Sequence, residues 1–62
     1  MDPKCIAELG CGWGELALAL SSHYNQAEVV AYELSPLPYA VAACRAGGKN
    51  NLSVQLEDFF NV

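Results

Sequence analysis

The sequence predicts an α/β fold, because short apolar runs that suit strands alternate with longer segments that have helical spacing. Its 62 residues allow one domain at most, since folded domains usually contain about 50 to 250 residues. The composition, 53% hydrophobic and 16% charged, is too apolar for a disordered chain. Three glycines clustered after the first apolar run indicate a tight connection between a strand and a helix.

The first predicted strand covers about residues 4–9, where the apolar run Cys5-Ile6-Ala7 precedes the glycine-rich segment 10–14. A helix is predicted over about 14–22, with Glu15 well placed near its positive N-terminal end. Its apolar residues recur at helical spacing, so we expect one face to pack on the sheet, formed by Trp13, Leu16, Ala17 and Leu20.

The second strand is predicted over about 27–33, a run too short for a helix and rich in β-branched and aromatic residues. A second helix over about 36–46 follows Ser35 as N-cap and ends at two consecutive glycines. Its expected apolar face contains Tyr39, Ala40, Ala43 and Cys44. The last strand, about 52–57, alternates apolar and polar residues.

Two successive strand–helix–strand units predict parallel strands, and right-handed crossovers place both helices on one face of the sheet. We therefore predict a Rossmann-like three-layer α/β sandwich, of which residues 1–62 form a single partial domain. This incomplete β-α-β-α-β half has a three-stranded parallel sheet. One face of the sheet and the edge of the first strand stay uncovered, which offers a surface for self-association.

Each predicted strand delivers an acid to the edge of the sheet where ligands of open parallel sheets bind. The three segments there are Glu8–Gly14, Glu33-Leu34 and Glu57-Asp58-Phe59. Glu33 ends the second strand 23 residues after Gly10 (33 − 10), close to the offset of about 20 residues expected for an acid that binds ribose hydroxyls.

A phosphate-bearing ligand is not favoured at this edge. Glu15 stands where a nicotinamide fingerprint has its third glycine, and its carboxylate would repel a pyrophosphate. No Gly-Lys-Ser/Thr sequence is present that could form a phosphate loop. The residues therefore predict a ligand without phosphates.

The segment Glu8-Leu9-Gly10-Cys11-Gly12-Trp13-Gly14 resembles motif I of the class I S-adenosylmethionine-dependent methyltransferases, which reads acid-x-Gly-x-Gly-x-Gly. The resemblance implies that the three glycines lie under the methionine and ribose portions of S-adenosylmethionine. It implies that Glu8 supports the loop and the amino group of the cofactor. Cys11 belongs to the same cofactor-binding loop, where we interpret it as a small spacer rather than a nucleophile, although a thiol near a helix start can have a lowered pKa.

The family's later motifs also match residues at the strand ends. The resemblance implies that Glu33 takes the ribose hydroxyls, that Leu34 and Phe59 flank the adenine, and that Asp58 accepts from the adenine amino group. Two alternatives stay open at this strand end: Glu57 could face the ligand instead of Asp58, and Phe59 could belong to the core. The resemblance extends from about Cys5 to Phe60 and covers only the cofactor-binding front half of the family's fold.

We therefore expect the S-adenosylmethionine-binding portion of a methyltransferase, with the acceptor and the catalytic residues unknown and this chain alone inactive. Two alternatives stay open. A nucleotide-dependent oxidoreductase half would bind NADH instead, and a non-enzymatic association module would use the uncovered sheet to bind a partner or itself.

Charge and composition exclude several other classes of protein. A net charge of −4 and three scattered bases argue against direct nucleic-acid binding. No apolar run approaches the roughly 18 residues needed to cross a bilayer. The start of the chain lacks a secretion signal, so we expect a cytoplasmic location. The three cysteines form no Cys-x-x-Cys pair, so we expect reduced thiols and no metal site.

Overall fold

The structure, a computed structural model, describes residues 4–58. Each bound of its helices and strands differs from the predicted bound by at most one residue. In chain order they are β1 (Cys5–Leu9), α1 (Glu15–His23), β2 (Glu28–Glu33), α2 (Pro36–Ala46) and β3 (Leu52–Leu56). Neither of the two helices in this described segment is long and apolar enough to cross a membrane.

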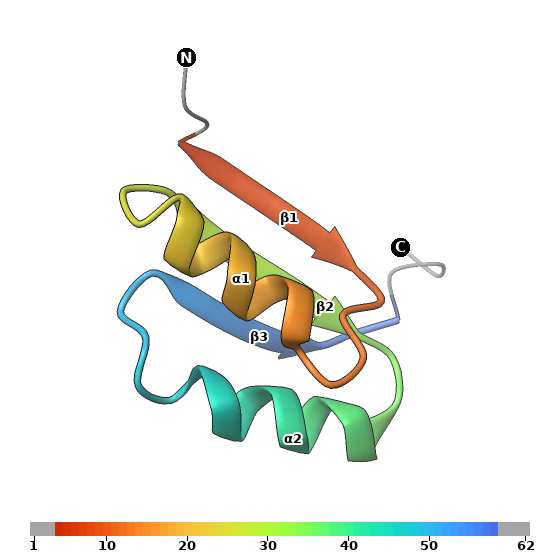
Figure 1. Ribbon diagram of the computed structural model, residues 1–62. Coiled ribbons are helices and arrows are strands. Elements are labelled where there is room, and N and C mark those ends of the chain that lie inside the picture. Colours follow the sequence, from red (N-terminus) through yellow and green to blue (C-terminus); the bar gives the residue numbers. More distant parts are fainter. Residues whose placement is uncertain (1–3, 59–62) are drawn as a thin grey trace.

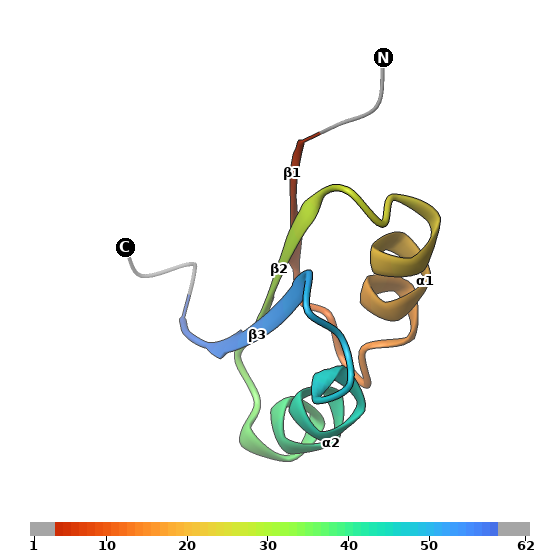
Figure 2. The same cartoon turned by 90° about the vertical axis from the view of Figure 1, so that its left-hand side faces the viewer.

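The strands of the described segment form one parallel three-stranded sheet in the order β1-β2-β3, as predicted. Their arrowheads point the same way in Figure 1, so the connections that leave β1 and β2 start from one edge of the sheet. Figure 2 shows both helices on the same side of the sheet, which is the arrangement that two right-handed crossovers require. Residues 4–58 thus form two layers of a Rossmann-like α/β sandwich.

The core lies between the helices and the covered face of the sheet, and it is built mainly from small residues. Val29 and Ala31 of β2 are fully buried, and Ala17 of α1 and Ala42 of α2 pack against them. Alanines at these contacts let each helix lie close to the strands. The remaining members of the buried cluster are Cys11, Ala46 and Leu52.

The helix faces differ from the sequence prediction. Of the face predicted for α1, Ala17 is fully buried as expected, whereas Trp13 and Leu16 are 49% and 58% exposed, and Ser21 is buried in their place. Helix α2 buries Ala42 and Ala46, whereas the predicted residues Ala40 and Cys44 are exposed. Both helices carry apolar residues on more than one side, so periodicity alone does not select the side that packs. The close approach to the sheet selects small side chains and turns larger ones outward.

Asn51 ties together the edge of the sheet opposite the glycine loop. Its side-chain amide lies 2.9 Å from the Ser21 carbonyl oxygen, 3.4 Å from that of Tyr24 and 3.0 Å from that of Ala27. One side chain therefore joins the end of α1, the start of β2 and the start of β3. The sequence pattern does not reveal these contacts, because Asn51 is 24 to 30 residues from its partners.

Candidate functional site

The predicted site residues gather at the edge where the parallel strands end. The β1–α1 and β2–α2 connections both leave from this edge (Figure 1). The Glu57 amide donates to the Glu33 carbonyl oxygen at 3.0 Å, so the chain enters Asp58 directly beside the end of β2. Residues 4–58 enclose no pocket at this edge, which makes the site an open surface.

The loop between β1 and α1 depends on glycine. Gly10, Gly12 and Gly14 have φ angles of 74°, 57° and 87°, in the left-handed region that other residues rarely adopt. Gly14 has a second constraint, because a Cβ atom there would lie 3.0 Å from the Ala42 Cβ of α2. The alternating glycines therefore serve loop geometry at all three positions and helix packing at one.

The backbone amides of the loop bind the end of β2. The N–H groups of Gly10 and Cys11 donate to the Tyr32 carbonyl oxygen at 2.8 and 3.0 Å. The Gly12 N–H donates to Glu33 Oε1 at 2.7 Å, and the Gly14 N–H donates to the Cys11 carbonyl at 3.0 Å. Phosphate-binding loops need such amides free to face the ligand. This loop is therefore poorly suited to a pyrophosphate.

Glu33 is a buried carboxylate whose negative charge is stabilised by backbone N–H groups. One carboxylate oxygen accepts a hydrogen bond from the Gly12 N–H, and the other accepts one from the Ser35 N–H at 2.9 Å. The residue is only 7% exposed. The hydrogen bond from Ser35, followed by that from Gly12, lowers the pKa of Glu33 below its ordinary value. An ionised carboxylate can accept about four hydrogen bonds, so acceptor capacity remains for a ligand hydroxyl.

Glu8 has the opposite environment. It lies in β1 beside Ala31 of β2, which belongs to the core between the sheet and the helices. Its Oε1 atom is buried and has no hydrogen-bond partner among residues 4–58. Burial raises the pKa of Glu8 above its ordinary value. An unpaired buried oxygen is costly, so this atom is suited to a donor group supplied by a ligand.

The negative charges of Glu8 and Glu33 both act on the Cys11 thiol. The residue is 8% exposed, and its pKa is raised mainly by burial and further by the negative charges of Glu8 and Glu33. The nearby helix start does not lower it. A thiol with a raised pKa is a poor nucleophile, which favours the interpretation of Cys11 as a spacer. The hydrogen bond from the Gly12 N–H to Glu33 Oε1 places Glu33 against the loop, and Glu8 lies near the end of β1, which leads into the same loop.

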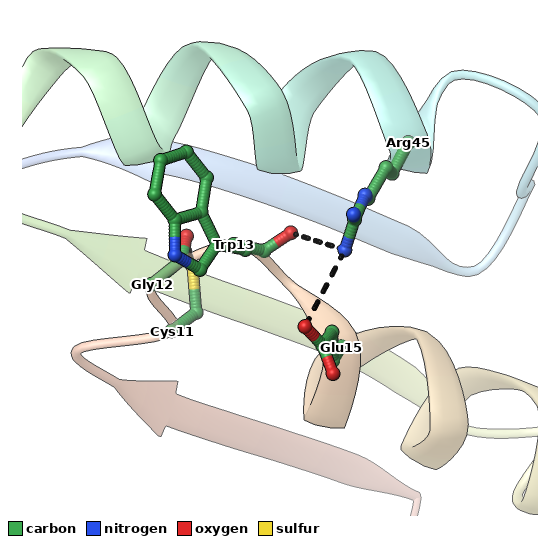
Figure 3. Close-up of polar contacts among 5 residues, drawn as sticks. All are labelled: Cys11, Gly12, Trp13, Glu15 and Arg45. Atoms are coloured by element: carbon green, nitrogen blue, oxygen red, sulfur yellow. Dashed lines mark hydrogen bonds and ion pairs between the residues drawn. The ribbon is translucent and has the colours of Figure 1, made fainter.

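Arg45 holds the loop from the side of α2. Its Nη1 atom lies 3.3 Å from the Trp13 carbonyl oxygen, to which it donates, and 4.0 Å from Glu15 Oε1 (Figure 3). Both side chains of this ion pair are largely exposed, so solvent screens the attraction and its contribution to stability is small. The sequence pattern does not reveal this contact, because Arg45 and Trp13 are 32 residues apart.

Two other predicted residues, Leu34 and Asp58, lie at the exposed rim of the site. Leu34 is 45% exposed directly after Glu33, and Asp58 is exposed after β3. Phe59 lies outside the described residues. Ser35 and Tyr32 are site residues that the sequence pattern missed, because they act through a backbone N–H and a backbone carbonyl. Such contacts leave no mark on side-chain identity.

Known proteins similar to this chain are methyltransferases. Release factor glutamine methyltransferase from Mycolicibacterium smegmatis is 49% identical over 43 residues, which are 69% of this chain and 15% of that protein. A crystal structure of coclaurine N-methyltransferase bound to N-methylheliamine and SAH superposes with a TM-score of 0.87 at 25% identity, over 100% of this chain and 19% of that one.

The StiE O-MT structure shares the fold, with a TM-score of 0.82 at 22% identity over 89% of this chain and 20% of its own. The chain thus spans 15% of the length of the curated relative that it matches. A family model described as a methyltransferase domain matches residues 6–62. Because that match covers most of the sequence, from the β1 residue Ile6 to the last residue, this chain belongs to the methyltransferase domain family.

Proposed function

We propose that this chain is the S-adenosylmethionine-binding portion of a class I methyltransferase, a single partial domain whose complete enzyme transfers a methyl group to an acceptor. The observation that carries the proposal is the pair of acids around the glycine loop. Glu8 has a buried oxygen that receives no hydrogen bond from residues 4–58, and Glu33 has a buried carboxylate with acceptor capacity left. A nucleoside with an amino-acid tail has a donor for each acid: its amino group for Glu8 and its ribose hydroxyls for Glu33.

Each site residue then has a defined task in binding. Glu33 accepts the ribose hydroxyls while it keeps its two backbone donors, and Glu8 accepts the amino group of the methionine portion. The bare backbone of the glycine loop lets the ligand approach closely. The proposed contacts to the adenine come from Leu34 and Asp58 and from Phe59, which lies outside the described residues.

The charge of the site suits this cofactor. When bound, S-adenosylmethionine supplies a methyl group activated on a cationic sulfonium. Carboxylates at Glu8 and Glu33, the strand residues beside the loop, lower the energy of a nearby cation. The residues that we assign bind and orient, so their contribution to the reaction is alignment of the methyl group with an acceptor. None of them is assigned as a catalytic residue.

The oxidoreductase alternative is less consistent with the loop. NADH carries a pyrophosphate, and that group is normally bound by amides at a helix N-terminus. Here the amides of Gly10, Cys11, Gly12 and Gly14 donate to protein acceptors. A pyrophosphate at this edge would also face the carboxylates of the site without a base among the residues that form the loop.

Titration calorimetry with S-adenosylmethionine and with NADH tests the proposal. We expect the methyl donor to bind and NADH not to bind. Glu33→Ala is expected to weaken binding by about 1–3 kcal/mol, the usual value of hydrogen bonds to a charged group. Glu28→Ala is the matched control, since Glu28 is an exposed acid at the other end of β2. NADH binding, or equal affinity of the Glu33 variant, would contradict the proposal.

The uncovered face of the sheet supports an association role as a second candidate. Figure 2 shows no helix of the described segment on that side, and Leu9 on the edge strand β1 is 62% exposed. A stable oligomer in light scattering that does not respond to S-adenosylmethionine would favour this role over cofactor binding.

We also propose that the protein works in the cytoplasm. Its three cysteines, Cys5, Cys11 and Cys44, are all free thiols, which suits a reducing compartment. Detection of the protein in the cytosolic fraction of its own cells checks this proposal.

A further inference from the structure

We infer that the Glu33 carboxylate fixes the conformation of the glycine loop before any cofactor binds, which makes Glu33 a positioning residue as well as a ribose ligand. The ribose role rests on the proposed function, whereas the role in the loop stands on the geometry of the ligand-free chain. The Glu33 side chain then both holds the glycine loop in its binding conformation and contacts the ligand itself.

The contacts of Glu33 reach two segments that are distant in sequence. Its Oε1 atom accepts from Gly12 in the β1–α1 loop at 2.7 Å, and its Oε2 atom accepts from Ser35 at the start of α2 at 2.9 Å. The residue is 7% exposed, so these bonds form in a largely water-free environment. Glu33 therefore joins the loop after β1 to the connection after β2.

Gly12 needs such a contact more than its neighbours do. Its φ of 57° is one of several conformations open to glycine, and folding must select it. Among the described residues, nothing lies within 4 Å of the position that a Cβ atom would take at Gly12, so packing does not hold it. The adjacent Trp13 carbonyl is held by Arg45, through a longer and exposed bond of 3.3 Å.

The loop and the carboxylate depend on each other. A buried carboxylate is costly unless donors surround it, and its two donors here are backbone amides. If the loop moved away, Glu33 would lose one of them and retain its charge. Ionised Glu33 thus favours the loop conformation seen here, and the ribose hydroxyls meet acceptors whose positions are already set.

Nuclear magnetic resonance of the ligand-free 62-residue chain tests this inference. Amides that donate to a carboxylate change their chemical shift when it becomes protonated. We expect the Gly12 and Ser35 amides to titrate together, with a midpoint below the ordinary range for glutamate. Glu8 and Cys11 at the same loop have raised pKa values, so their transitions are separate from that of Glu33.

In Glu33→Gln the shared transition should disappear at both amides, and the Gly12 amide should exchange with solvent about tenfold faster or more. Glu28→Gln, at the exposed start of β2, should leave both readouts unchanged. Independent titration of the two amides in the natural chain, or a transition that survives in Glu33→Gln, would overturn the inference. If Glu33→Gln does not fold, the titration of the natural chain decides. No cofactor is present, so the result does not depend on whether S-adenosylmethionine binds.

Discussion

Replacing Gly14 with alanine tests how the loop and the two helices are fitted together. Gly14 caps the start of α1 with a φ of 87°, beyond the usual left-handed range of side-chain-bearing residues. The new Cβ atom would lie 3.0 Å from the Ala42 Cβ and 3.2 Å from the Ala42 Cα. The second of these contacts is with backbone, so helix α2 itself must shift to relieve it.

The expected loss of stability is the sum of two effects. A left-handed conformation costs an alanine about 1–2 kcal/mol. Overpacking against a well-packed backbone typically costs about 1–3 kcal/mol. Gly14→Ala should therefore lower the free energy of unfolding by about 2–5 kcal/mol, a large share of the stability of a small domain. Gly12→Ala is the matched control, because it carries the φ cost and has open space around the new Cβ.

Urea unfolding followed by circular dichroism measures both variants. We expect Gly12→Ala to lose about 1–2 kcal/mol, less than Gly14→Ala. Adding Ala42→Gly removes one of the two close contacts, so a double-mutant cycle should show favourable coupling of about 0.5–3 kcal/mol with Gly14→Ala. Equal losses in the two single variants, or no coupling with Ala42, would refute the packing argument.

Two further substitutions test the Asn51 contacts at the end of the sheet opposite the glycine loop and the buried acid Glu8. Asn51→Asp places a carboxylate against three carbonyl oxygens and should cost about 3–5 kcal/mol of unfolding free energy in urea, whereas Asn50→Asp at the exposed neighbour should change little. Glu8→Gln removes a charge whose raised pKa means that the folded chain holds the proton more tightly than the unfolded chain. Glu8 therefore lowers the free energy of unfolding as the pH rises above the ordinary pKa of glutamate. Glu8→Gln should raise the urea midpoint at pH 7. The same substitution should weaken S-adenosylmethionine binding in calorimetry. A lower midpoint would contradict this reasoning.

The elements and their order are predictable because their signals are local. Glycines after β1, Ser35-Pro36 before α2 and the short β-branched run of β2 each act within a few residues. Local turn chemistry and periodicity determine such boundaries, and parallel topology follows from the alternation of strands and helices. The acids at the strand ends were identifiable for the same reason, since a strand end brings its next residues to a known edge.

The packing faces of the helices could not be predicted in this way. In α2 the apolar residues surround most of the helix, so no stripe distinguishes Ala42 and Ala46 from Ala40 and Cys44. Likewise, the spacing of Trp13 and Leu16 favours the sheet, yet the residues that α1 buries fully are the small ones, Ala17 and Ser21. Steric fit between distant segments decides these positions, and periodicity carries no information about it.

The amino-acid sequence by itself determined the α/β alternation, the tight glycine-rich turn after β1 and the presence of an acid at each strand end, because each depends on neighbouring residues. Only the tertiary structure decided what those acids do. Within residues 4–58 it left Glu8 with a buried oxygen that has no hydrogen-bond partner and gave Glu33 two backbone donors, so the pKa of Glu8 is raised and that of Glu33 is lowered. The physical reason is that desolvation and hydrogen bonding depend on which distant atoms surround a carboxylate, and folding alone brings those atoms together.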